Sequence, residues 1–204
     1  IGDGVRVVTR FLYEARKLFP EAGITFHDRC RAVQKRVFAI SNTKDQKKRK
    51  KLYKELYAFG REVVGYGRAA ITRLFALQGT EEEKEAARFI ARELRDYVRL
   101  LSKILDQTDR RVFKGKKVPA DEKVVSIFEP HTDVIEKGGR ETVFGHKVFL
   151  AVGCRNLVLD CLIEEGNPAD TELFPELLGR HRTFYRRPPK DVARVRWRQA
   201  RGER

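Results

Sequence analysis

The chain has 204 residues, of which 41% are hydrophobic and 36% charged, and its formal net charge is +15. This apolar content is sufficient for the core of one domain with room for a second lobe, and no apolar run approaches the about 20 residues that cross a bilayer. The basic balance favours a polyanionic partner, most commonly nucleic acid, while a soluble protein rich in lysine is the alternative.

The first part of the chain, residues 1–117, is a basic region with 29 Lys and Arg against 15 Asp and Glu. Gly79 can end one helix, and Thr80 with Glu83 forms a capping box that starts the next. We therefore expect the last two helices of this region to pair as an antiparallel hairpin. Apolar residues at three- and four-residue steps predict helices over 4–19, 27–40, 52–77 and 81–106.

A basic run occupies residues 44–51, which read KDQKKRKK. One interpretation is a surface that follows phosphates, because lysine and arginine displace the counterions condensed along a duplex. The other interpretation is a solvated helix entrance or loop, since runs of like charge are often simply exposed. Under the first interpretation, the nucleic-acid-binding residues are Lys44, Lys47, Lys48, Arg49, Lys50 and Lys51.

The pattern changes after Lys117, and residues 118–179 carry 5 Lys and Arg against 12 Asp and Glu. A helix start is predicted from Asn167 as N-cap, with Pro168 and Asp170 in the first turn. The predicted fold class is therefore α+β, a helical region followed by a β-β-β-α region. Strands are predicted over 124–128, 146–152 and 157–163, and the last two form a hairpin joined by residues 153–156.

Several polar residues of this region are candidates for chemistry. Glu129, His131 and Asp133 alternate along the chain, which allows their side chains to converge on a metal ion, although a surface turn is the favoured interpretation. His146 is better explained by a positioning contact with a carboxylate than by catalysis. Asp170 has a sufficient role at a helix N-terminus.

The last segment, residues 180–204, carries 10 Lys and Arg against 2 Asp and Glu. Its lack of periodicity predicts a disordered basic tail, and Arg186 and Arg187 complete the expected nucleic-acid-binding set. Cys30, Cys154 and Cys161 lack metal-ligand spacing, which predicts buried free thiols in a reducing cytosol.

Three segments carry a family resemblance: 123–133 (KVVSIFEPHTD), 144–148 (FGHKV) and 166–170 (GNPAD). Together with 2–10 at the start, they resemble the insertion-sequence transposases of the ISNCY type, within the broader DDE transposases. The resemblance implies an RNase H-like fold, of which 118–179 is a partial sheet with its first helix and 1–117 a helical insertion. In the intact family, carboxylates on the sheet hold two Mg²⁺ or Mn²⁺ ions for DNA cleavage and strand transfer.

Departures from the family pattern imply an inactive fragment that binds no metal. None of the three catalytic carboxylates falls on a residue of this chain, and the second, expected just after Ala193, is replaced by Arg194 and its neighbours. We expect a missing start and a frameshifted end, because reading one base later around Trp197 gives Gly-Gly, as the family motif requires. The resemblance further implies insertion-sequence ends as the DNA partner and a bacterial cytoplasmic, nucleoid-associated location.

Two other functions stay open. The first is a non-enzymatic nucleic-acid-binding protein that uses 44–51 and 180–204 as basic arms. The second is a helical interaction module, because Ile90, Leu94, Tyr97, Leu101 and Ile104 form a coiled-coil-like seam. Such a seam can pack on a partner, including a second copy of the chain in a homodimer.

Overall fold

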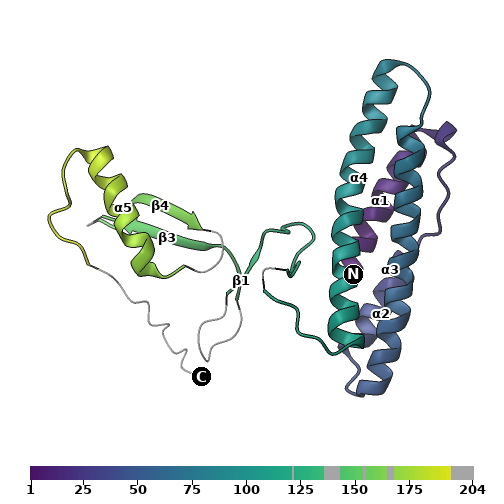
Figure 1. Cartoon of the computed structure of the whole chain (residues 1–204), viewed down its shortest axis with the longest axis horizontal. Coiled ribbons are helices and arrows are strands. Elements are labelled where there is room, and N and C mark those ends of the chain that lie inside the picture. The colour runs from purple at the N-terminus through teal and green to yellow at the C-terminus, as the bar shows by residue number, and fades with distance from the viewer. Residues whose placement is uncertain (121, 136–142, 154, 165–167, 194–204) are drawn as a thin grey trace. The chain divides into compact units, whose positions relative to one another are not determined.

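The computed structural model describes residues 1–120, 122–135, 143–153, 155–164 and 168–193. The chain divides into two compact units, Ile1–Thr132 and Asp133–Arg204. The first unit is helical, and the second holds short antiparallel strand pairs and a helix (Figure 1). The predicted α+β class is therefore confirmed.

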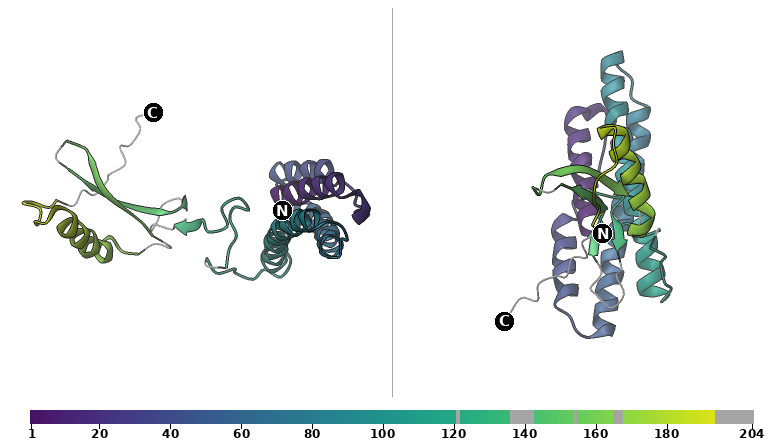
Figure 2. Two further views of the ribbon diagram at one scale, coloured as in Figure 1. Left: turned by 90° about the horizontal axis from the view of Figure 1, so that it is seen from above. Right: turned by 90° about the vertical axis from the view of Figure 1, so that its left-hand side faces the viewer.

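Four α-helices of the first unit lie alongside one another (Figures 1 and 2). All four predicted helices are confirmed, and the third begins earlier than predicted, so that most of the basic run is helical. The elements are α1 (Gly2–Leu18), the short turn η1 (Pro20–Ala22), α2 (Cys30–Ser41), α3 (Gln46–Phe75), α4 (Glu81–Thr108) and the π-helical turn η2 (Asp109–Phe113).

Side-chain caps define where the two long helices begin. The Asp45 carboxylate accepts hydrogen bonds from the backbone N–H groups of Lys47 at 2.8 Å and Lys48 at 3.4 Å, at the start of α3. At the start of α4, the Thr80 N–H donates to Glu83 at 2.8 Å and the Glu83 N–H donates to the Thr80 hydroxyl at 3.3 Å. The predicted capping box is therefore confirmed.

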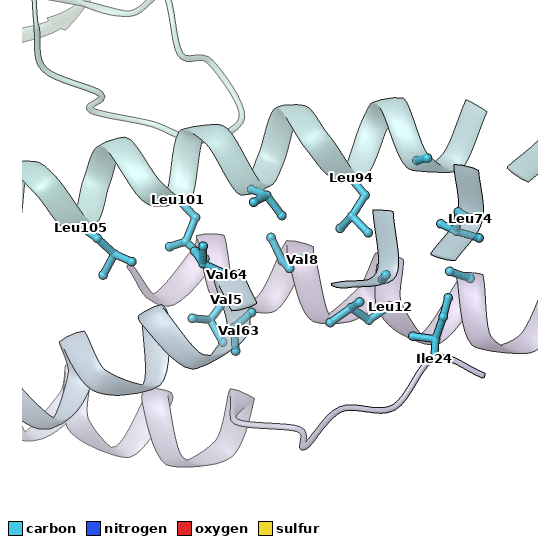
Figure 3. Close-up of a cluster of buried hydrophobic side chains, with 14 of the residues drawn as sticks. Val5, Val8, Leu12, Ile24, Val63, Val64, Leu74, Leu94, Leu101 and Leu105 are labelled. Atoms are coloured by element: carbon cyan, nitrogen blue, oxygen red, sulfur yellow. The ribbon is translucent and has the colours of Figure 1, made fainter. Parts of the chain in front are cut away.

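Apolar side chains of α1, α3 and α4 meet in the core of this unit, as Figure 3 shows. Burying each such side chain stabilises the fold by about 1.5–3 kcal/mol. Leu94 and Leu101 of the predicted seam belong to this core, so the seam packs against helices of its own chain. The labelled core residues are at most 6% exposed: Val5, Val8, Leu12, Ile24, Val63, Val64, Leu74, Leu94, Leu101 and Leu105.

Glycines on α3 allow close contact with α4. A Cβ atom at Gly60 would lie 2.8 Å from Leu105 Cδ2, and one at Gly67 would lie 2.4 Å from Val98 Cγ2. The partners on α4 run backwards as α3 runs forwards, which shows that the two helices are antiparallel. The predicted helical hairpin is confirmed.

The strand predicted over 124–128 is wrong. These residues adopt no regular structure, and Ile127 is instead 4% exposed, with its Cδ1 3.2 Å from the point where a Cβ of Gly4 would lie. Val118 is 3% exposed, and the Gln107 side chain donates to the Glu122 carbonyl at 3.0 Å. Contacts with α1 and α4 replace the sheet neighbour that a strand would need, so 118–132 packs with the helices.

The second unit contains two antiparallel strand pairs, in which β1 pairs with β2 and β3 with β4. The predicted hairpin is confirmed in the second pair, where Val148 faces Ile163 across the strands. Asn156 adopts a left-handed φ of 56° in its turn. The elements are β1 (Asp133–Ile135), β2 (Val143–Gly145), β3 (Lys147–Val152), β4 (Val158–Glu164) and α5 (Asp170–Tyr185).

One face of the β3–β4 hairpin packs on α5, where Leu162, Leu173 and Leu177 form a small buried cluster. Leu173 and Leu177 form the apolar face of the helix. The other face of the hairpin is apolar and open. Its side chains are 50–67% exposed: Val148, Leu150, Val152, Val158 and Ile163. Cys161, which was predicted to be buried, is exposed because its position in β4 faces away from α5.

Helix α5 differs from the prediction at both ends. Its N-cap is Ala169, whose N–H donates to Glu172 at 3.0 Å, and the predicted N-cap Asn167 lies outside the described residues. The helix continues through Gly179 because Arg180 is held on Asp160 of β4 by hydrogen bonds of 2.8 and 2.7 Å. The first residues of the predicted tail are therefore helical.

Candidate nucleic-acid interface

The basic run forms the exposed start of α3. Lys47 through Lys51 lie in its first two turns and are all exposed, as is Lys44 just before Asp45. Successive residues of an α-helix are about 100° apart, so five consecutive cations surround the helix. Among the residues that the structure describes, no carboxylate forms an ion pair with any of them.

This arrangement opposes the preference of the helix itself. The N-terminus of a helix carries partial positive charge, so cations in the first turn are unfavourable by about 0.3–1 kcal/mol each at low salt. The first turn of α3 contains no acidic residue, and the carboxylate of the capping residue Asp45 already accepts two backbone N–H groups. The concentration of positive charge is therefore suited to an external anion. From Gln46 onward the run is an exposed helix entrance and not a loop, as one form of the second interpretation predicted.

A second basic segment lies against the first half of α3. Because α3 and α4 are antiparallel, the C-terminal end of α4 lies beside the first half of α3 (Figure 1). The rings of Tyr57 and Phe113, 5.5 Å apart at 85°, hold η2 against α3. Arg111 lies in η2, Lys116 and Lys117 follow it, and all three are exposed. The Tyr57 contact brings this segment to α3 about two turns after the basic run.

Two other cations of this segment are already paired. Arg110 donates to Glu122 at 2.5 Å and to Asp106 at 3.4 Å. Lys114 pairs with Asp109, and the hydrogen bond between them raises the pKa of the Lys114 ammonium group. These pairs fix the turn after α4, while Arg111, Lys116 and Lys117 make no ion pair within the described ranges.

This second segment was not among the predicted binding residues, although the sequence contains a signal for it. The predicted hairpin joins 52–77 to 81–106, which brings the residues after 106 back to the start of the third helix. Arg186 and Arg187, the remaining predicted binding residues, are exposed just after α5 in the second unit.

The candidate metal ligands are not brought together in the part of the chain that is described. Glu129 accepts a hydrogen bond from the Thr132 hydroxyl at 3.3 Å, and Asp170 pairs with Lys147 at 2.6 Å. His131 lies in the turn before β1, and His146 lies between β2 and β3. No group of three His, Cys, Asp or Glu residues in the described ranges could hold a metal ion.

Comparisons of the chain with protein-family models, with curated proteins and with solved structures give no match. Within the described ranges, no helix is both long enough and apolar enough to cross a membrane.

Proposed function

We propose that the helical unit binds the phosphate backbone of DNA through the basic end, a surface made by two segments of the chain. The observation that carries this proposal is the set of exposed, unpaired cations in the first two turns of α3, with three more on the segment that Phe113 holds against Tyr57 of the same helix. Backbone contacts of this kind supply affinity without reading sequence. The basic end consists of Lys44, Lys47, Lys48, Arg49, Lys50, Lys51, Arg111, Lys116 and Lys117.

The proposed setting of this activity is a DDE transposase of the ISNCY type. Support comes from the motifs at 123–133, 144–148 and 166–170 and from a β-hairpin followed by a helix in the second unit. In that setting the partner is the end of an insertion sequence, the location is the bacterial nucleoid, and the unit containing β3, β4 and α5 is part of an RNase H-like sheet. Mg²⁺ or Mn²⁺ would serve the intact family, and this chain contributes DNA binding.

The second candidate is a non-enzymatic nucleic-acid-binding protein. It requires only the exposed cations of the basic end, because contacts with phosphates need no catalytic group. Incubation of the chain with supercoiled DNA and Mg²⁺ or Mn²⁺ addresses the reaction directly. We expect neither nicking nor strand transfer, and cleavage that is lost in Glu129→Gln or Asp170→Asn would contradict this expectation.

A salt titration of binding to a short DNA duplex tests the proposed interface. The logarithm of affinity falls with the logarithm of salt concentration by about 0.9 per phosphate contact. Replacing Lys47, Lys48 and Lys51 together by Gln is therefore expected to reduce the slope by up to about 2.7.

The matched control removes the same charge from exposed cations elsewhere on the unit. Lys17, at the end of α1, and Arg88 and Arg92, in the first half of α4, are exposed and lie away from the basic end. Their triple replacement by Gln is expected to leave most of the slope intact. Equal loss in both triple variants would mean that only net charge matters, and the proposed interface would be wrong.

A further inference from the structure

A groove of about 400 Å³ lies between α3 and α4 on the surface of the helical unit. Gly65, which is exposed, is one of the residues that line it. Its charged side chains come from both helices. The residues that line it include Tyr57, Arg61, Gly65 and Arg68 of α3, Ser102 and Asp106 of α4, and Asp109 of η2.

Gly65 has no packing role in the fold. A Cβ added at this position would meet no atom within 4 Å, whereas one at Gly60 or Gly67 would press into α4. Glycine in a helix interior costs about 1 kcal/mol relative to alanine. At Gly60 and Gly67 the close approach of α4 accounts for this cost. At Gly65 no close contact accounts for the cost, and the position lines the groove.

The charge of the groove that is left uncompensated is positive. Asp106 shares Arg110 with Glu122, at 3.4 and 2.5 Å respectively, and Asp109 is paired with Lys114. With Arg61 and Arg68 included, four cations stand against three carboxylates. Arg61 and Arg68 are exposed and have no ion-pair partner in any described part of the chain. An anion that enters the groove therefore meets two available guanidinium groups.

The two arginines lie on either side of Gly65 along α3. Arg61 is four residues before Gly65 and Arg68 three residues after it, so their Cα atoms are about 10 Å apart along the helix axis. The planar guanidinium group donates paired hydrogen bonds that match the oxygens of a phosphate. The groove also adjoins the second basic segment, because Tyr57 in its wall makes an edge-to-face contact with Phe113 of η2.

We propose that this groove binds a backbone phosphate of the DNA, held by Arg61 and Arg68 over Gly65. The proposal rests on the proposed DNA binding and extends the binding surface from the basic end along the α3–α4 hairpin. A duplex presents one phosphate charge per about 1.7 Å of its length, so a DNA segment seated on the basic end offers phosphates along the groove.

The test uses the full chain, a short DNA duplex and a salt titration. Replacing Arg61 and Arg68 together by Gln is expected to reduce the salt slope by up to about 1.8, or about 0.9 for each lost contact. An unchanged slope in this variant, with the helical circular dichroism retained, would overturn the proposal.

A second pair of variants tests the groove itself. Gly65→Glu places a carboxylate in the groove, whereas Ala69→Glu places the same charge at an exposed position of α3 that does not line it. We expect Gly65→Glu to weaken binding at least tenfold more than Ala69→Glu. Equal weakening by the two would show a general charge effect and overturn the proposal.

The failure of this proposal is distinguishable from the failure of the proposed function. If the triple variant of Lys47, Lys48 and Lys51 binds DNA as the parent does, the basic end is not the interface. If that variant loses affinity, while the double Arg61 and Arg68 variant keeps the parent's salt slope and Gly65→Glu weakens binding no more than Ala69→Glu, the groove alone is excluded.

Discussion

Alanine substitutions at Gly65 and Gly67 test how closely α3 and α4 pack. Both glycines lie in the interior of α3, so each substitution gains about 1 kcal/mol of helix propensity. At Gly65 the new methyl group meets no atom within 4 Å. At Gly67 it would lie 2.4 Å from Val98 Cγ2 and 3.5 Å from Val8 Cγ1.

The magnitude follows from what must move at each site. Val98 is β-branched and has one strongly preferred rotamer in a helix, so it cannot swing away and the helices must separate slightly. Such overpacking costs about 1–3 kcal/mol. We therefore expect Gly65→Ala to stabilise the helical unit by about 1 kcal/mol and Gly67→Ala to destabilise it by up to about 2 kcal/mol.

Urea unfolding followed by far-ultraviolet circular dichroism measures both variants, because most of the helix in the described ranges belongs to the first unit. The difference between the two variants isolates the packing cost, since the propensity gain is common to both. Equal free energies of unfolding for Gly65→Ala and Gly67→Ala would refute the close packing of α3 on α4.

Two further predictions concern polar groups of the helical unit. Thr9 is 2% exposed, its hydroxyl oxygen has no hydrogen-bond partner in the described ranges, and the neighbouring Cys30 thiol is only a weak hydrogen-bonding group. Thr9→Val is therefore expected to raise the free energy of unfolding by about 1 kcal/mol, and a loss of thermal stability would contradict this. Glu62 accepts hydrogen bonds from Arg29 at 2.8 Å and Tyr66 at 2.7 Å, which lower the pKa of its carboxyl group below the ordinary 4.5. Its stabilising contribution is therefore full above that pH and is lost as the pH falls through the lowered pKa. Glu62→Gln should flatten the acid limb of a stability profile, and an unchanged limb would exclude the linkage.

The elements that the sequence predicted well are specified by residues close together in the chain. The capping box of Thr80 and Glu83, the apolar period of the helices and the turn between β3 and β4 involve neighbours within a few positions. Local hydrogen bonding and burial of one face therefore decide them.

The elements that the sequence predicted poorly depend on distant partners. Ile127 belongs to a short apolar run that suits a strand, but its burial beside Gly4 requires knowledge of how α1 and α4 pack. Helix α5 continues through Gly179 because Arg180 donates a hydrogen bond to Asp160 on β4. The candidate site also depends in part on distant partners. The run at 44–51 is visible in the sequence, whereas Arg111, Lys116 and Lys117 come near α3 only because α3 and α4 form a hairpin.

The cationic start of α3 gives this helix end and its proposed ligand opposite responses to ionic strength. The charges from Lys47 to Lys51 lie well within the Debye length of about 10 Å at 0.1 M salt, so dilution of salt increases their mutual repulsion and frays the first turns. Added salt screens that repulsion, yet it also weakens binding to a polyanion. A bound phosphate backbone neutralises the same charges directly. Formation of the first turns of α3 is therefore coupled to phosphate binding at the basic end. We expect the helical content of these turns to be highest when the proposed ligand is bound.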